Sequence, residues 1–130
     1  MESIFSKIAK REIPSYKVAE SEKYYAFLDI NPLATGHVLV IPKNEIDYFF
    51  DLTDNDMAEM MAFTKKVAIA IKNAIPCKRV GMAVIGFDVP HAHVHLITMQ
   101  NMQDIDFKRK RVKLSKEEFL ATAEKIGNCF

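Results

Sequence analysis

Apolar residues recur at three- and four-residue steps through the middle of the chain, a pattern that predicts a long amphipathic helix. The stripe consists of Met57, Met60, Met61, Thr64, Val67, Ala68, Ile71 and Ile75. Thr53 and Asp56 resemble a capping box at its start, with Asp in place of the usual Glu, and Pro76 ends it. A methionine-rich stripe can be a binding surface, but we expect this one to face the core.

Two further helices are predicted at the ends of the chain. Ser3 is a cap for a short N-terminal helix, which Pro14 stops. Its apolar face comprises Ile4, Phe5 and Ile8. Ser115 and Glu118 form a second capping box, from which a final helix continues towards Gly127.

Four apolar runs are typical of strands, at residues 24–28, 37–41, 80–85 and 91–99. The first two are joined by residues 31–36, whose Asn-Pro and Thr-Gly steps favour a turn. The third run is expected to be a buried strand, followed by a turn at 86–90. Strands and helices do not alternate regularly, so the pattern predicts an α+β fold with an antiparallel sheet.

Composition limits the function classes. A chain of 130 residues, 49% hydrophobic and 27% charged, is typical of one soluble domain. The net charge of +1 favours neither nucleic acid nor an anionic membrane as a partner. The basic run at 108–113 is interpreted as a solvated segment, with an RNA- or phosphate-binding patch as the less favoured alternative. Two distant cysteines, no signal segment and no membrane-length apolar run indicate a cytoplasmic protein without a disulfide framework.

Three of the four histidines alternate along one predicted strand, at His91, His93 and His95. Residues two apart in a strand share a face, so the three imidazoles would line one side of the sheet. A single histidine in a strand is usually structural, but three in strict alternation make that interpretation improbable. The fourth, His37, begins another predicted strand just after a turn, where functional side chains often lie.

Two chemistries could use this row. Neutral imidazoles bind zinc, copper or iron, although no cysteine and no carboxylate at ligand spacing accompanies them. Alternatively, one imidazole attacks phosphorus while a charged neighbour protonates the leaving group. The residues favour phosphoryl-type transfer modestly over metal binding.

The row His91-Ala92-His93-Val94-His95-Leu96-Ile97 resembles the signature of the histidine triad (HIT) family. Segments 3–8, 13–14, 26–32 and 36–43 are similar to its Hint-like nucleotide-binding branch, so the resemblance covers about the first hundred residues in order. It implies a HIT-like fold: about five antiparallel strands, a long central helix, and short N-terminal and C-terminal helices. Residues 1–130 would form one HIT domain, with about 101–130 as a divergent C-terminal extension.

The resemblance also implies roles. His93 would attack the α-phosphorus of a nucleotide, His95 would contact the phosphate and leaving group, and His91 and His37 would fix the row. Asp29 would bind the ribose hydroxyls. Apolar residues expected to contact the substrate are Ile4, Phe5, Ile8, Phe27, Ile30 and Val89.

The implied activity is hydrolysis of a purine nucleoside phosphoramidate, such as an AMP derivative, through a nucleotidyl-His93 intermediate. The alternatives are a dinucleoside polyphosphate hydrolase or nucleotidyl transferase, and a catalytically weak nucleotide-binding regulatory protein. The resemblance implies a homodimer and requires neither metal nor cofactor. One departure concerns Asp88, which replaces a neutral polar residue near the phosphate. Its carboxylate would repel a phosphate, so either it points away or the leaving group is cationic.

Overall fold

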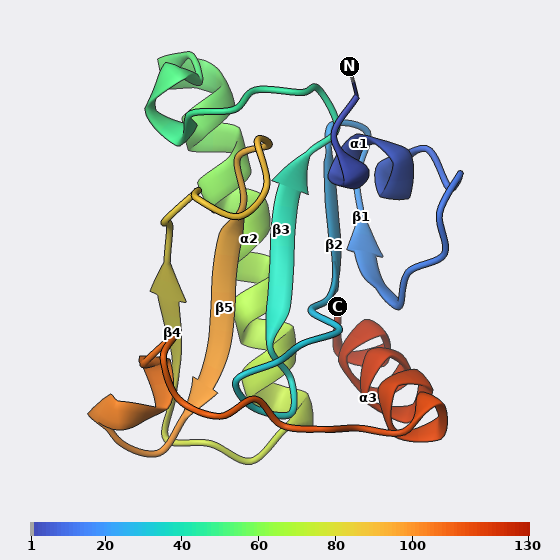
Figure 1. Cartoon of the computed structure of the whole chain (residues 1–130), viewed down its shortest axis with the longest axis vertical. Coiled ribbons are helices and arrows are strands. Elements are labelled where there is room, and N and C mark those ends of the chain that lie inside the picture. Colours follow the sequence, from blue (N-terminus) through green and yellow to red (C-terminus); the bar gives the residue numbers. More distant parts are fainter. Residues whose placement is uncertain (1) are drawn as a thin grey trace.

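The apolar runs of the chain pair into one antiparallel sheet of five strands, in the spatial order β1-β2-β3-β5-β4 (Figure 1). The computed structural model describes residues 2–130. The strands are β1 (Lys17–Glu20), β2 (Tyr24–Leu28), β3 (Val38–Pro42), β4 (Arg79–Ala83) and β5 (Val94–Met99). Since β3 and β5 are neighbours, the hairpin formed by β2 and β3 lies beside the histidine row.

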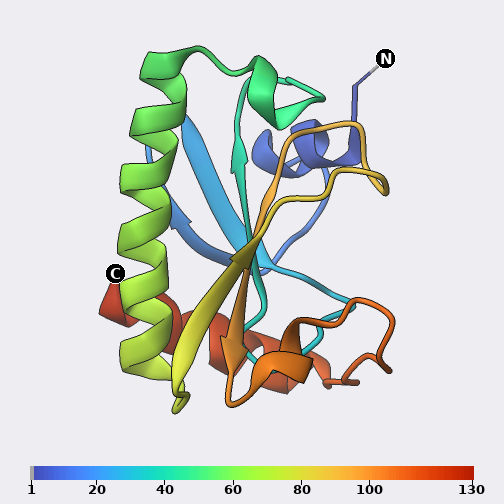
Figure 2. The ribbon, with the colours of Figure 1, turned by 90° about the vertical axis from the view of Figure 1, so that its left-hand side faces the viewer.

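Helices and loops cover the two faces of the sheet differently (Figure 2). The helices are α1 (Ile4–Ala9), α2 (Asp54–Ala74) and α3 (Lys116–Cys129), with 3-10 turns η1 (Phe49–Asp51) and η2 (Met102–Ile105). On one face, α2 and α3 pack on the sheet over the main apolar core. The other face carries α1, the loop at 84–93 and the segment at 106–114 (Figure 2). His93 and His95 lie on this face, since the His93 ring contacts Phe5 of α1 and the His95 ring contacts Phe107 of the segment.

The predicted helices are confirmed. Met60 is fully buried in the core beneath α2, and Met57 and Met61 pack against that core, so the methionine stripe faces inward. Thr53 accepts a hydrogen bond from the Asp56 N–H at 3.1 Å. The Asp56 carboxylate lies 3.6 Å from the ammonium of Lys23, however, and only half of that capping box forms. At α3 both halves of the box form.

Several predicted boundaries were wrong. The first helix ends at Ala9, well before Pro14, and the chain then turns through Arg11 at φ 64. The third predicted strand spans only 79–83 and is an exposed edge, not a buried strand. The fourth begins at Val94, so His91 and His93 lie just before the strand. Strand β1 was missed, because four residues give too short a pattern to read without their partner β2.

None of the helices within residues 2–130 combines the length and apolar character that crossing a membrane requires.

Candidate active site

All four histidines lie on or beside the two central strands. His95 is in β5 and pairs with Leu39 of β3, and His37 directly precedes β3. The ring centroids of His93 and His95 are 5.0 Å apart, and those of His37 and His95 are 5.2 Å apart. Each of the four residues is at most 4% exposed. The structure therefore brings the predicted histidines together in one cluster.

The hydrogen bonds of His93 fix which of its nitrogens carries the proton. Its Nδ1 lies 2.7 Å from the carbonyl oxygen of His91. Because a carbonyl only accepts, Nδ1 donates, and the lone pair of the neutral ring is on Nε2. Nε2 is buried and has no hydrogen-bond partner among residues 2–130. The ring of Phe5 contacts the ring of His93 edge-on, with centroids 5.1 Å apart, and holds its plane.

His91 is anchored from both sides and faces away from solvent. Its Nε2 donates to the carbonyl of Pro42 at 2.7 Å, so its Nδ1 accepts from the Ser3 hydroxyl, also at 2.7 Å. The Ser6 hydroxyl in turn donates to Glu45 at 2.8 Å. Hydrogen bonds from the Ser3 N–H and the Ser6 hydroxyl lower the pKa of the Glu45 carboxyl to about 2. His91 thus ties α1 to the row, while its own pKa is lowered chiefly by burial.

His37 and His95 form a directed pair. The Leu33 N–H donates to His37 Nδ1 at 3.0 Å, so the proton of the neutral His37 ring is on Nε2. That Nε2–H donates to His95 Nδ1 at 2.9 Å, which leaves the His95 proton on Nε2. Burial lowers the pKa of His37 to about 4, with the charge of Arg111 as a second cause. Burial, and then the neighbouring His37 and His93, lower that of His95 to about 4.

These pKa values refine the chemistry expected of the row. At neutral pH the His95 ring is uncharged and offers an Nε2–H as a hydrogen-bond donor. The sequence had suggested that a charged histidine next to the attacking one protonates the leaving group. In the free chain, His95 is not charged and is not that acid. A bound phosphate anion would favour the charged form.

One group of residues has the spacing of a metal site. Single ligand atoms of Asp29, His37 and His95 lie within 4.8 Å of one another. To bind a metal, however, His37 Nε2 would need a free lone pair, so the proton of the ring would move to Nδ1. The Nδ1–H would then face the Leu33 N–H, and two donors would meet with no acceptor between them. The hydrogen bonds therefore favour the directed histidine pair over a metal centre.

Asp88 does not point away from the row. Its Oδ1 lies 3.2 Å from His93 Nε2, although the two atoms are not aligned as a hydrogen bond, and the Asp88 side chain is 69% exposed. The carboxylate thus stands beside the His93 lone pair. The expectation that Asp88 points away was therefore wrong, and the other expectation, a cationic leaving group, stays a prediction.

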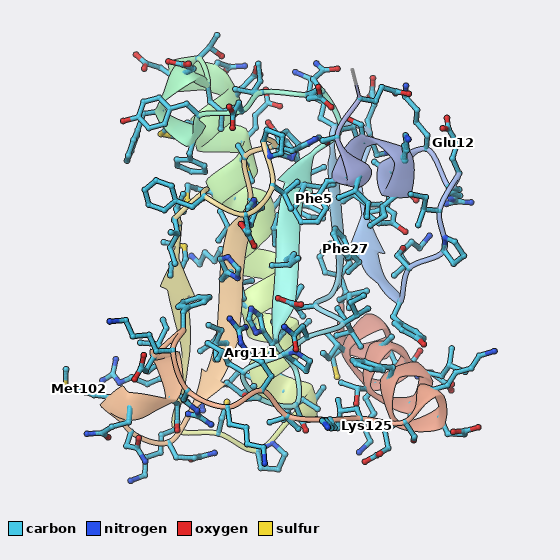
Figure 3. All side chains as sticks on the ribbon, viewed as in Figure 1. Phe5, Glu12, Phe27, Met102, Arg111 and Lys125 are labelled. Atoms are coloured by element: carbon cyan, nitrogen blue, oxygen red, sulfur yellow. The ribbon has the colours of Figure 1, made fainter. Side chains whose placement is uncertain are left out.

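The predicted apolar contacts divide into two groups. Phe5 and Ile8 of α1 are buried together with Phe27 of β2, and Val89 packs against this cluster. Figure 3 shows Phe5 and Phe27 on this face of the sheet. Ile4 and Ile30 are instead 50% and 73% exposed and lie outside that cluster. Asp29 lies beside the histidines, with its Oδ2 3.5 Å from His37 Nε2.

The segment at 106–114, which we call the strap, places two further residues near the histidines. Sequence reasoning missed Phe107, and it interpreted Arg111, within the basic run, as part of a solvated segment. The Phe107 ring lies edge-on to His95, with centroids 4.8 Å apart, and the Arg111 guanidinium lies 5.6 Å from the Phe107 centroid. Figure 3 shows Arg111 on the sheet face that carries the histidines. Phe107, Arg109 and Arg111 are half-buried while Lys108 and Lys110 are exposed. The signal in the sequence was the alternation of Phe and Arg with Lys over residues 107–111.

Two pockets lie against the row. One, of about 290 Å³, includes His93 and the apolar residues Tyr48, Phe50 and Val84. The other, of about 280 Å³, is lined by Asp29, Asn31, Ile85, Phe87, Asp88, His95, Phe107 and Arg111. Ile85 and Phe87 line both. The arrangement combines a buried imidazole lone pair on His93, a directed N–H donor on His95 and two adjoining pockets.

Comparison with known proteins agrees with this class of site. The family model described as HIT domain matches residues 10–102. An uncharacterized HIT-like protein of Borreliella burgdorferi is 35% identical over 132 residues, which cover 95% of each chain. An adenosine 5'-monophosphoramidase of Schizosaccharomyces pombe is 36% identical over 131 residues, covering 98% of each. A HIT-like protein of Bartonella henselae involved in cell-cycle regulation has a TM-score of 0.85 at 28% identity, covering 99% of this chain and 96% of that one.

The fold and the histidine row define the class of protein, one whose nucleotide site is built from histidines. The chain belongs to the HIT family, and the similarity to an adenosine 5'-monophosphoramidase supports the predicted Hint-like branch.

Proposed function

We propose that this protein is a nucleotide hydrolase that cleaves purine nucleoside phosphoramidates through a covalent intermediate on His93. The observation that carries the proposal is the lone pair on His93 Nε2, which is fixed there by the bond from Nδ1 to the His91 carbonyl. The similarity to a relative named as an adenosine 5'-monophosphoramidase supports the same substrate class.

The reaction proceeds in two displacements. His93 Nε2 attacks the α-phosphorus, a nitrogen–phosphorus bond forms, and the bond to the leaving amine breaks as the amine takes up a proton from solvent. The His95 Nε2–H donates a hydrogen bond to a phosphoryl oxygen throughout and keeps its proton. Water then forms an oxygen–phosphorus bond and gives up a proton to solvent while the bond to His93 breaks, which releases the nucleoside monophosphate and the neutral ring. Asp29 binds the ribose hydroxyls. The base contacts that we propose are the exposed Ile4 and Ile30 together with the cluster of Phe5, Ile8, Phe27 and Val89, which is largely buried in the free chain and lines neither pocket.

Asp88 favours an amine over a polyphosphate as the leaving group. Its carboxylate is 3.2 Å from the attacking nitrogen, so it repels a polyphosphate, which carries more negative charge, more strongly than it repels a phosphoramidate. An amine is neutral or cationic at this point. A dinucleoside polyphosphate hydrolase or nucleotidyl transferase is therefore the second candidate, and a nucleotide-binding protein with vestigial catalysis is the third.

The test is AMP release from adenosine 5'-phosphoramidate by the wild type and by His93→Asn. Asn keeps an N–H donor near the His91 carbonyl but lacks the nucleophile, so we expect binding of AMP with turnover reduced at least about 1,000-fold. Rapid quenching followed by mass spectrometry should detect a nucleotidyl adduct on wild-type His93. Equal turnover by both proteins would refute the covalent scheme, and AMP binding without turnover by either would favour the third candidate.

We also propose a cytoplasmic homodimer joined along β4. This strand is at the edge of the sheet, and Met82 on the strand and Val84 and Ile85 directly after it are exposed. An unpaired edge strand with apolar neighbours is a template for pairing. Sedimentation equilibrium at the mass of one 14.8 kDa chain would contradict the dimer.

A further inference from the structure

Arg111 is a cation in a pocket that otherwise contains carboxylates. Among the described residues that line the pocket next to His95, Asp29 and Asp88 are acidic, and Arg111 is the one lysine or arginine. A phosphorylated ligand in this pocket needs a positive partner, because each carboxylate would repel it. His95 cannot supply that charge in the free chain, since burial lowers its pKa to about 4.

The charge of Arg111 is not neutralised by the protein. Within residues 2–130, no carboxylate oxygen lies within 4.0 Å of its guanidinium nitrogens. Two of its N–H groups donate instead to backbone carbonyls, one to Asn31 at 3.1 Å and one to Phe107 at 3.3 Å. A guanidinium has five N–H donors, so others remain for a ligand.

The strap holds this guanidinium in place. The Val112 N–H donates to the Pro32 carbonyl at 2.9 Å, and Arg109 donates to the Leu33 carbonyl at 3.2 Å. These bonds attach both sides of Arg111 to the turn that follows Asp29. The Phe107 ring contacts both the guanidinium and the His95 ring. A half-buried, positioned cation interacts with an anion more strongly than one on a mobile surface chain does.

The other basic residues of the strap have different surroundings. Arg109 is paired with Asp104 at 2.9 Å, so its charge is already compensated. Lys108, Lys110 and Lys113 are exposed. The basic run is therefore not one uniform patch. Within it, Arg111 is the residue that lines the pocket next to His95 and has no carboxylate partner among residues 2–130.

We propose that Arg111 binds a phosphate group of the nucleotide and makes the strap part of the substrate site. This inference rests on the proposed function, and it adds a phosphate-recognising residue from outside the histidine signature. The phosphate is either the 5'-phosphate that His93 attacks or one carried by the ribose beside Asp29, and the guanidinium recognises both by the same charged hydrogen bonds.

The test compares the affinities of adenosine, AMP and adenosine 3',5'-bisphosphate for the wild type, Arg111→Met and Lys110→Met, measured by calorimetry. Lys110→Met removes one positive charge from the exposed side of the same strap. We expect Arg111→Met to weaken a phosphorylated ligand about 10- to 100-fold while adenosine changes little, and Lys110→Met to change neither. Arg111→Lys should recover part of the loss.

The pattern of losses identifies the phosphate. A loss already present for AMP assigns the 5'-phosphate, and a loss confined to the bisphosphate assigns the ribose phosphate. Equal losses for adenosine and both nucleotides would show that Arg111 only holds the fold, and no loss, or an equal loss in Lys110→Met, would also overturn the inference. Failure of the wild type to bind AMP would refute the proposed function itself, which wild-type phosphoramidate turnover tests separately.

Discussion

At the scale of single residues, proton positions decide what each histidine can do. Two carbonyls, of His91 and Pro42, and one backbone N–H, of Leu33, fix the tautomers of the neutral rings. His93 therefore presents a lone pair on Nε2, whereas His95 presents an N–H. The alternation of histidines predicted the cluster. The tautomers could not be predicted, because they depend on which backbone group each ring meets in the folded chain, such as the Pro42 carbonyl beside His91.

Asp88 is expected to control the choice of leaving group. Asp88→Asn removes a carboxylate beside the attacking nitrogen with little change of shape. We expect kcat/KM for diadenosine tetraphosphate to rise about 10-fold relative to that for adenosine phosphoramidate, a modest factor because the side chain is largely exposed and screened. Asp47→Asn is the control, since Asp47 is exposed and lines the pocket of His93. An unchanged ratio in Asp88→Asn would show that Asp88 does not select substrates.

At the scale of elements, the sequence predicted those helices that are determined by interactions between residues close together in the chain. The long helix and the capped final helix follow from periodicity and capping, which act within one segment. Strand β1 and the strap depend on contacts with distant residues, such as the bond from Val112 to Pro32. The contact of the strap with the histidines was missed for this reason, although Phe107, Arg109 and Arg111 alternate with lysines in the sequence.

Helix α1 is also joined to the row through its cap. The Ser3 hydroxyl accepts from the Ser6 N–H at 3.1 Å and donates to His91 Nδ1, so one side chain caps α1 and orients His91. We expect Ser3→Ala to lower the free energy of unfolding by about 1 to 2 kcal/mol and also to reduce kcat, with Ser3→Thr recovering both. Chemical denaturation and phosphoramidate turnover measure the two effects.

The cap of α3 supplies the matched control. Ser115 accepts from the Glu118 N–H at 3.1 Å, at the start of a helix on the opposite face of the sheet. Ser115→Ala should cost about 1 kcal/mol of stability and leave kcat unchanged. If Ser3→Ala proves as harmless to turnover as Ser115→Ala, the anchor on His91 has no catalytic consequence.

At the scale of the whole molecule, the row makes stability depend on pH. His37 and His95 have pKa values of about 4 in the folded protein, mainly because they are buried, whereas an unfolded histidine titrates near about 6.5. Between these values the unfolded chain binds more protons than the folded one, so stability falls as the pH is lowered from about 6.5 towards 4. The lowered pKa of His91 acts in the same direction.

This dependence can be assigned to the buried pair by measurement. From pH 7 to pH 5 we expect each of the two rings to remove about 2 kcal/mol from the free energy of unfolding. Glu45, with a folded pKa of about 2, loses its contribution only at lower pH, outside this interval. His37→Gln keeps groups that can bond to Leu33 and His95 but does not titrate, so its loss over the interval should be smaller by about one ring's contribution. Urea unfolding at the two pH values measures the difference, and an equal loss in both proteins would mean that His37 is not held neutral by the fold.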